Sequence, residues 1–212
     1  MIDFQINRFP VIILANFRTG SSPLAIHLAR KYNLECYSEP FHNENIAKYD
    51  EHKMKFIHRC MNSTNTNYIV KFMPSQISDL NNYDLLMNGD GFKIRLNRKN
   101  KFDQIVSLYI AEKRNKYFKL KNENQIKYYL EIDKKALIES TNSILRNDFL
   151  LERLPYKYDM DLSYEDLGFI ENTDHVLSDL PDNIEELQQE VRKILFWRWN
   201  QLKTSIHNIL EP

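Results

Sequence analysis

Residues 11–29 read VIILANFRTGSSPLAIHLA, and the character of the chain changes twice within this stretch. Residues 11–15 form a continuous apolar run, which is typical of a central strand buried on both faces. From Ser22 onwards apolar residues recur at helical spacing, and Pro23 suits the first turn of a helix. The segment between the two patterns, RTGS, reads as a glycine turn. The stretch therefore predicts a strand, a turn and a helix in direct succession.

Such a junction is suited to an anion. Backbone N–H groups and the positive end of a helix dipole converge where a strand passes through a glycine turn into a helix. Gly20 permits close approach of the backbone, Ser21 and Ser22 offer hydroxyl donors, and the Arg18 guanidinium matches phosphate or sulfate oxygens. A tight turn whose serines cap the helix would use the same residues without a ligand. The pattern lacks the lysine that follows the last glycine of a nucleotide-binding P-loop, so an ordinary ATP or GTP site is not expected.

The same alternation of patterns continues along the chain. Further strands are expected at residues 34–37, 68–72, 92–96 and 157–162, and further helices at residues 102–117, 134–153 and 184–209. Strands that alternate with helices favour a parallel sheet. We therefore expect an α/β fold, a three-layer sandwich with a central parallel sheet flanked by helices, and a single domain over residues 1–212.

Composition narrows the class of protein. The chain has 29 Lys and Arg against 29 Asp and Glu, so no net charge directs it towards nucleic acid. Its two cysteines, Cys36 and Cys60, have no metal-ligand spacing and read as free thiols. The apolar run near the N-terminus is too short to span a bilayer. We expect a cytoplasmic protein without a membrane span or a metal site.

A second cationic segment, residues 93–107, reads KIRLNRKNKFDQIVS. The strand expected at residues 92–96 has Arg95, Arg98 and Lys99 at its end, and Ser107 lies in the second turn of the helix that follows. A cationic strand end and a helical hydroxyl together suit a second phosphate.

With both segments in place, the chain resembles the sulfotransferase superfamily, whose first motif binds the 5′-phosphosulfate of the nucleotide donor and whose second binds its 3′-phosphate. Here these motifs are RTGSS and RKNKFDQIVS. The resemblance covers roughly residues 10–170 and includes SEPF at 38–41, VKFM at 70–73 and SYEDL at 163–167. It is greatest to the bacterial and Golgi-type branches. It implies a P-loop-like sulfotransferase fold.

The resemblance implies a donor, PAPS (3′-phosphoadenosine-5′-phosphosulfate), a product, PAP, and no metal. The acceptor of the sulfuryl group would be a hydroxyl or an amine of a small molecule or carbohydrate. Two departures from the family pattern matter. Pro23 lacks an N–H that relatives offer the 5′-phosphate, and the family's spacing places the second cation at Lys99 rather than Arg98. The donor-binding residues so implied are Arg18, Thr19, Gly20, Ser21, Ser22, Arg98 or Lys99, and Ser107.

Sulfuryl transfer needs cations near the leaving phosphate and a base for the acceptor's proton. Arg18 is the expected cation. Glu39, after the second strand, is the base implied by the resemblance, and His42 is the competing base because imidazole titrates near neutral pH. Lys71 lies inside an apolar strand, where it either points towards an anion or belongs to an edge strand.

Other functions remain open from the sequence. One is a P-loop-type nucleotide kinase, and another is a catalytically silent protein that binds PAP or another nucleotide with the same fold. The last expected helix carries Trp197 and Trp199 and is apolar around much of its circumference. It either closes the core or forms a homodimer contact.

Overall fold

The computed structural model describes residues 4–40, 67–76, 87–114, 128–168 and 180–210, with side chains as far as residue 198. The chain groups into two compact units. The first consists of Met1–Lys99 and Arg146–Thr173, and the second of Asn100–Leu145 and Asp174–Pro212. The expectation of a single domain stays a prediction, and the two units are described separately.

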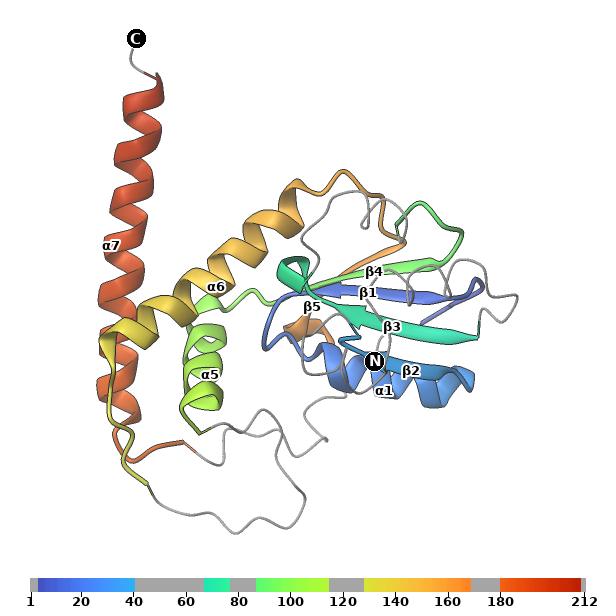
Figure 1. The fold of residues 1–212 in the computed structure, drawn as a ribbon, viewed down its shortest axis with the longest axis horizontal. Coiled ribbons are helices and arrows are strands. Elements are labelled where there is room, and N and C mark those ends of the chain that lie inside the picture. The colour runs from blue at the N-terminus through green and yellow to red at the C-terminus, as the bar shows by residue number, and fades with distance from the viewer. Residues whose placement is uncertain (1–3, 41–66, 77–86, 115–127, 169–179, 211–212) are drawn as a thin grey trace. The chain divides into compact units, whose positions relative to one another are not determined.

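The first unit contains a sheet of five parallel strands in the order β2-β3-β1-β4-β5. The strands are β1 (Val11–Ala15), β2 (Glu35–Ser38), β3 (Tyr68–Phe72), β4 (Phe92–Asn97) and β5 (Met160–Ser163). In the centre of the sheet, Ile13 lies opposite Lys71 on one side and Ile94 on the other. Because all five strands run in one direction, their carboxyl ends meet at a single edge (Figure 1). That edge is where open α/β sheets bind ligands.

Helices cover both faces of this sheet. On one face, alternate β1 residues such as Val11 and Ile13 pack in one cluster with Leu24 and Leu28 of helix α1 (Ser21–Tyr32). On the other face, Ile12 and Leu14 belong to a second cluster with Leu151, near the end of helix α6 (Lys134–Arg153). The expected three-layer α/β sandwich with a central parallel sheet is confirmed.

The element bounds differ little from those expected. The strand expected over residues 157–162 begins three residues later, at Met160, which pairs with Ile94 of β4. Two short 3₁₀ helices follow strands at the carboxyl edge, η1 (Pro74–Gln76) after β3 and η2 (Tyr164–Asp166) after β5. They turn the chain sharply, which keeps polar side chains close to the strand ends.

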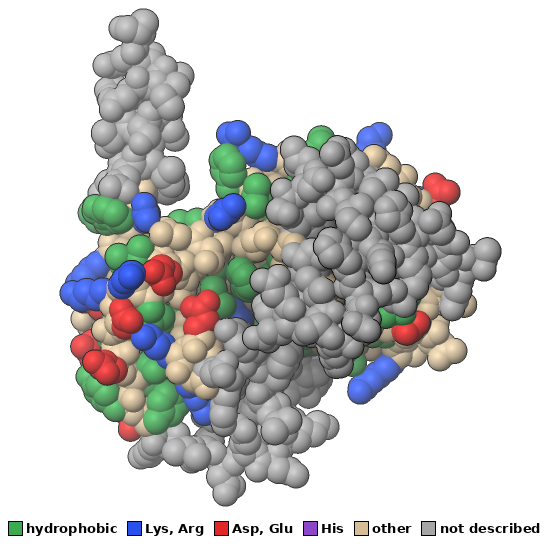
Figure 2. All heavy atoms as spheres, viewed as in Figure 1, with side chains coloured by type: hydrophobic (Ala, Val, Ile, Leu, Met, Phe, Trp, Pro, Cys, Tyr) green, Lys and Arg blue, Asp and Glu red, His purple; other side chains and the backbone are tan. Residues whose placement is uncertain are grey.

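The second unit is helical. It contains α5 (Lys101–Arg114), the first part of α6, and α7 (Ile184–Leu210). Figure 2 shows Lys and Arg side chains intermingled with Asp and Glu over this unit, rather than one sign of charge gathered in a patch. In the part of the chain that the structure describes, no helix has both the length and the apolar character needed to cross a membrane.

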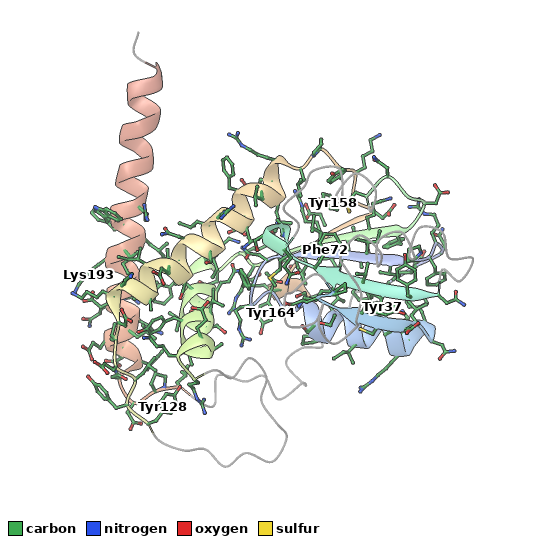
Figure 3. The ribbon with its side chains drawn as sticks, viewed as in Figure 1. Tyr37, Phe72, Tyr128, Tyr158, Tyr164 and Lys193 are labelled. Atoms are coloured by element: carbon green, nitrogen blue, oxygen red, sulfur yellow. The ribbon has the colours of Figure 1, made fainter. Side chains whose placement is uncertain are left out.

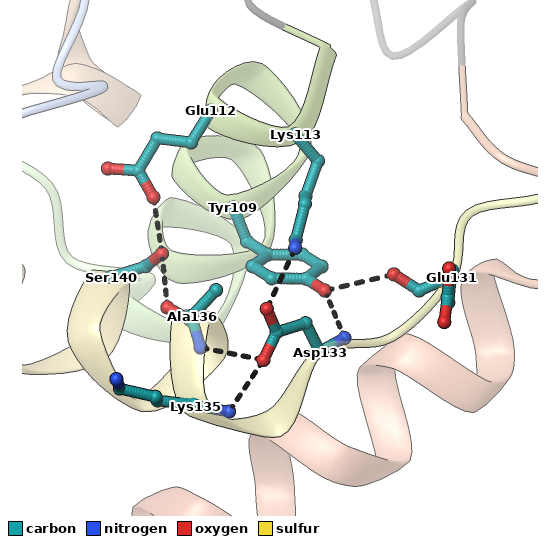
Figure 4. Close-up of polar contacts among 8 residues, drawn as sticks. All are labelled: Tyr109, Glu112, Lys113, Glu131, Asp133, Lys135, Ala136 and Ser140. Atoms are coloured by element: carbon teal, nitrogen blue, oxygen red, sulfur yellow. Dashed lines mark hydrogen bonds and ion pairs between the residues drawn. The ribbon is translucent and has the colours of Figure 1, made fainter.

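A polar network fixes the start of α6. The fully buried Tyr109 accepts a hydrogen bond at its hydroxyl from the backbone N–H of Asp133, at 2.7 Å (Figure 4). The Asp133 carboxylate accepts from the N–H groups of Lys135 (3.0 Å) and Ala136 (3.1 Å) and pairs with Lys113 at 3.0 Å. Asp133 is therefore the N-terminal cap of α6.

Candidate anion-binding site

The turn between β1 and α1 presents a helix start without a side-chain cap. Gly20 is the N-cap residue, with a left-handed φ of 74°, and it makes no side-chain cap hydrogen bond. Ser21 and Ser22 lie inside the first turn, so neither serine is the N-cap residue. The first helical turn contains no acidic residue. A helix start of this kind is an anion-binding feature of the backbone itself.

Contacts within the turn hold its shape. The fully buried Thr19 donates its hydroxyl to the carbonyl of Asn16 at 2.8 Å. Asn16 is also buried, and its side chain accepts from the N–H of Phe17 and donates to Asp148 of α6, both at 2.7 Å. Arg18 has a left-handed φ of 54°. The Thr19 hydroxyl is thus committed to the turn, and Asn16 is a site residue that the sequence did not reveal.

Lys71 brings a buried cation to this turn from the neighbouring strand. Its side chain is 4% exposed, its Nζ lies 3.0 Å from Ser22 Oγ, and it forms an ion pair with Glu39. Burial lowers the pKa of Lys71, the Glu39 carboxylate opposes that shift, and the charge of Arg18 adds to it. Because β3 lies between β2 and β1, the edge-strand alternative for Lys71 is wrong.

Glu39 follows β2 directly, with a left-handed φ of 53°. Its N–H donates to the carbonyl of Lys71 at 2.8 Å, so its backbone continues the pairing of β2 with β3. Its carboxylate accepts from Lys71 at one oxygen and, at 3.0 Å, from Gln76 Nε2 at the other. Gln76, at the end of η1, was not expected from the sequence, because a lone glutamine after a strand-ending proline carries no periodic signal.

Arg98 lies beside the turn on the opposite side of β1. It follows β4, and its Nη1 donates to the carbonyl of Arg18 at 3.2 Å. Its guanidinium stacks 4.5 Å from the ring centre of Tyr164, which begins η2 (Figure 3). The buried Nε of Arg98 makes no hydrogen bond to any described residue. Lys99 points elsewhere, since it is exposed and pairs with Asp166 at 3.2 Å.

The remaining expected residues lie outside this group. Ser107 is on α5, in the second unit, and its expected role stays a prediction. His42 lies outside the described residues. Among the residues described, no group of three or more His, Cys, Asp or Glu side chains is placed to hold a metal ion.

The first unit thus gathers three cations, Arg18, Lys71 and Arg98, around an uncapped helix start. Two carboxylates lie beside them: Glu39, which pairs with Lys71, and Asp148, which accepts from Asn16. The three cations outnumber these two carboxylates. The arrangement suits an anionic group at the turn, with a proton acceptor beside it.

Comparison with known proteins gives no family. No family model matches the chain, and no curated protein matches it. Among solved structures, it is similar to shikimate kinase from Bacteroides thetaiotaomicron, at 13% identity and a TM-score of 0.46 over 87% of this chain and 97% of that one. It is also similar to the Acinetobacter baumannii shikimate kinase in complex with shikimate, at 11% identity and a TM-score of 0.43 over 79% and 96% of the two chains. The Aquifex aeolicus shikimate kinase matches at 13% identity and a TM-score of 0.40, over 88% and 96%. Similarity at this level identifies no activity for this chain.

Proposed function

We propose that this chain is a nucleotide-dependent transferase that takes a sulfuryl group from PAPS and places it on a hydroxyl or amine acceptor. The observation that supports this function best is the buried Lys71 ammonium, 3.0 Å from Ser22 Oγ at the uncapped start of α1. A buried cation at a helix start binds the 5′-phosphosulfate of the donor. The motifs RTGSS and SEPF, which supply Arg18 and Glu39, favour PAPS among nucleotide donors.

In this mechanism, the acceptor oxygen or nitrogen forms a bond to sulfur while the bond from sulfur to the 5′-phosphate oxygen breaks. The proton of the acceptor passes to the Glu39 carboxylate, which is paired with Lys71. The negative charge that leaves sulfur collects on the phosphate of PAP. Arg18 and Lys71 stabilise that charge, so they lower the barrier rather than tighten substrate binding alone. Arg98, whose buried Nε has no hydrogen-bond partner among the residues that the structure describes, is the proposed ligand of the 3′-phosphate.

Phosphoryl transfer from ATP is the second candidate function, and the position of Lys71 favours it as well. The sequence argued against a kinase because no lysine follows Gly20. Lys71 supplies an ammonium to the same turn from β3, and in a kinase this ammonium would bind the phosphates in place of the missing lysine. The structural neighbours described above are kinases, but their TM-scores are too low to decide between the two donors.

Calorimetric titration separates the candidates. The full chain is titrated with PAP and, separately, with ATP and Mg²⁺. PAP binding that Arg18→Ala weakens about 10- to 150-fold supports the PAPS site, since a hydrogen bond to a charged group contributes about 1.5–3 kcal/mol. Arg30→Ala, which removes an exposed arginine from the same helix, is the matched control. Binding of ATP but not PAP supports the kinase, and PAP binding without turnover of PAPS indicates a silent nucleotide-binding protein.

A further inference from the structure

Gln76 is held in one orientation by its own turn. It is 8% exposed, and its Oε1 accepts the backbone N–H of Met73 at 3.0 Å. Its Nε2 lies 3.0 Å from Glu39 Oε2. Rotating the amide by half a turn would place Nε2 against an N–H donor and Oε1 against a carboxylate, which leaves both contacts without a hydrogen bond. The amide group can therefore only donate towards Glu39.

The Glu39 carboxylate is thereby held at both oxygens. Lys71 donates to Oε1 and Gln76 donates to Oε2. The two donors come from β3 and from the turn that follows it, so they are fixed relative to each other by the sheet. A base fixed in this way loses little freedom when the acceptor arrives.

We propose that Gln76 is a positioning residue, which holds the Glu39 carboxylate in the orientation needed to accept the acceptor's proton. This inference rests on the proposed function of Glu39 as the base. Gln76 does not touch the reacting atoms. Its effect is on the rate of transfer, and it leaves donor binding unchanged.

The kinetic test uses PAPS with water as the acceptor and measures the release of PAP. Gln76→Leu removes the donor to Glu39 at similar size, and kcat should fall about tenfold or more while the affinity for PAP stays within twofold. Gln76→Glu keeps an acceptor for Met73 N–H but faces Glu39 with a second carboxylate. Its kcat should be low at neutral pH and recover as the pH is lowered, because a proton restores a donor between the two carboxyl groups.

Ser75→Ala is the control, because the Ser75 side chain is exposed on the same turn and only its backbone N–H is used, by Asn147 at 3.0 Å. A second measurement is independent of turnover: the side-chain amide protons of Gln76 should exchange slowly with solvent, and faster in Glu39→Ala. Wild-type turnover that Gln76→Leu leaves unchanged, or amide exchange that Glu39→Ala leaves unchanged, would overturn this role alone. Wild-type protein that neither binds PAP nor turns over PAPS would overturn the proposed function and this role with it.

Discussion

Replacing Lys71 by methionine tests whether the ion pair in the site is as desolvated as the structure indicates. The Lys71 side chain is 4% exposed and that of Glu39 is 23% exposed. Breaking a buried pair by removing one partner costs about 3–5 kcal/mol, because the other charge is left uncompensated. Glu39 retains Gln76 and some solvent, so we expect a loss near the lower end, about 3 kcal/mol of the free energy of unfolding.

The matched variants separate charge from packing. The double variant Lys71→Met with Glu39→Gln removes both charges and should recover most of the loss, since apolar or neutral replacements of a buried pair are tolerated. Lys99→Met, which breaks an exposed pair in the same unit, should change stability little.

The assay is urea unfolding followed by far-UV circular dichroism, with hydrogen exchange of the β3 amides. Both tryptophans, Trp197 and Trp199, lie on α7 in the second unit, so their fluorescence would report the wrong part of the chain. A cost of less than about 1 kcal/mol for Lys71→Met, or a double variant as unstable as the single one, would refute the reasoning.

Three further results are expected. Hydrogen bonds from the backbone N–H of Ala136 and, second, from Lys113 lower the pKa of Asp133 below its usual 3.8. The stabilisation that the Asp133 carboxylate gives the folded state is therefore present above pH 3.8, and it is lost as the pH falls through the lower pKa of the folded state. The gap in melting temperature between wild type and Asp133→Ala should accordingly close in acid. Leu151→Ala should cost about 2–5 kcal/mol in urea unfolding, because it leaves a cavity under the second face of the sheet. Asn16→Ala should cost about 1–3 kcal/mol and weaken PAP binding in calorimetry, because the turn loses its bond to α6.

The positions of the strands could be read from the sequence, but their order could not. Buried parallel strands appear as continuous apolar runs, and the bounds expected for residues 11–15 and 68–72 match β1 and β3. Each strand and helix pair looks alike in such a pattern, so nothing indicates which strands are neighbours. For this reason the sequence left open whether Lys71 belongs to an edge strand, and only the order β2-β3-β1 answers that question.

The candidate site could be predicted in part for a similar physical reason. Glu39 and Arg98 stand immediately after strands and Arg18 follows β1 within three residues, where polar residues are conspicuous against the apolar runs. Gln76 and Asn16 act through partners 37 and 132 residues away in the chain, Glu39 and Asp148. Contacts over such separations are properties of the folded sheet and leave no local pattern.

The backbone conformation of two site residues bears on how this protein balances folding against activity. Only three described residues other than glycine have a left-handed φ, and while Asn33 ends α1, the other two are Arg18 and Glu39. A side chain in that region costs of the order of 1–2 kcal/mol, which glycine would avoid. Glycine at position 18 should therefore raise the melting temperature as it removes the proposed chemistry, whereas glycine at position 39 would leave the buried Lys71 without its carboxylate and cost more than the backbone gains. On the proposed function, arginine at position 18, where the backbone would favour glycine, is a trade of stability for activity.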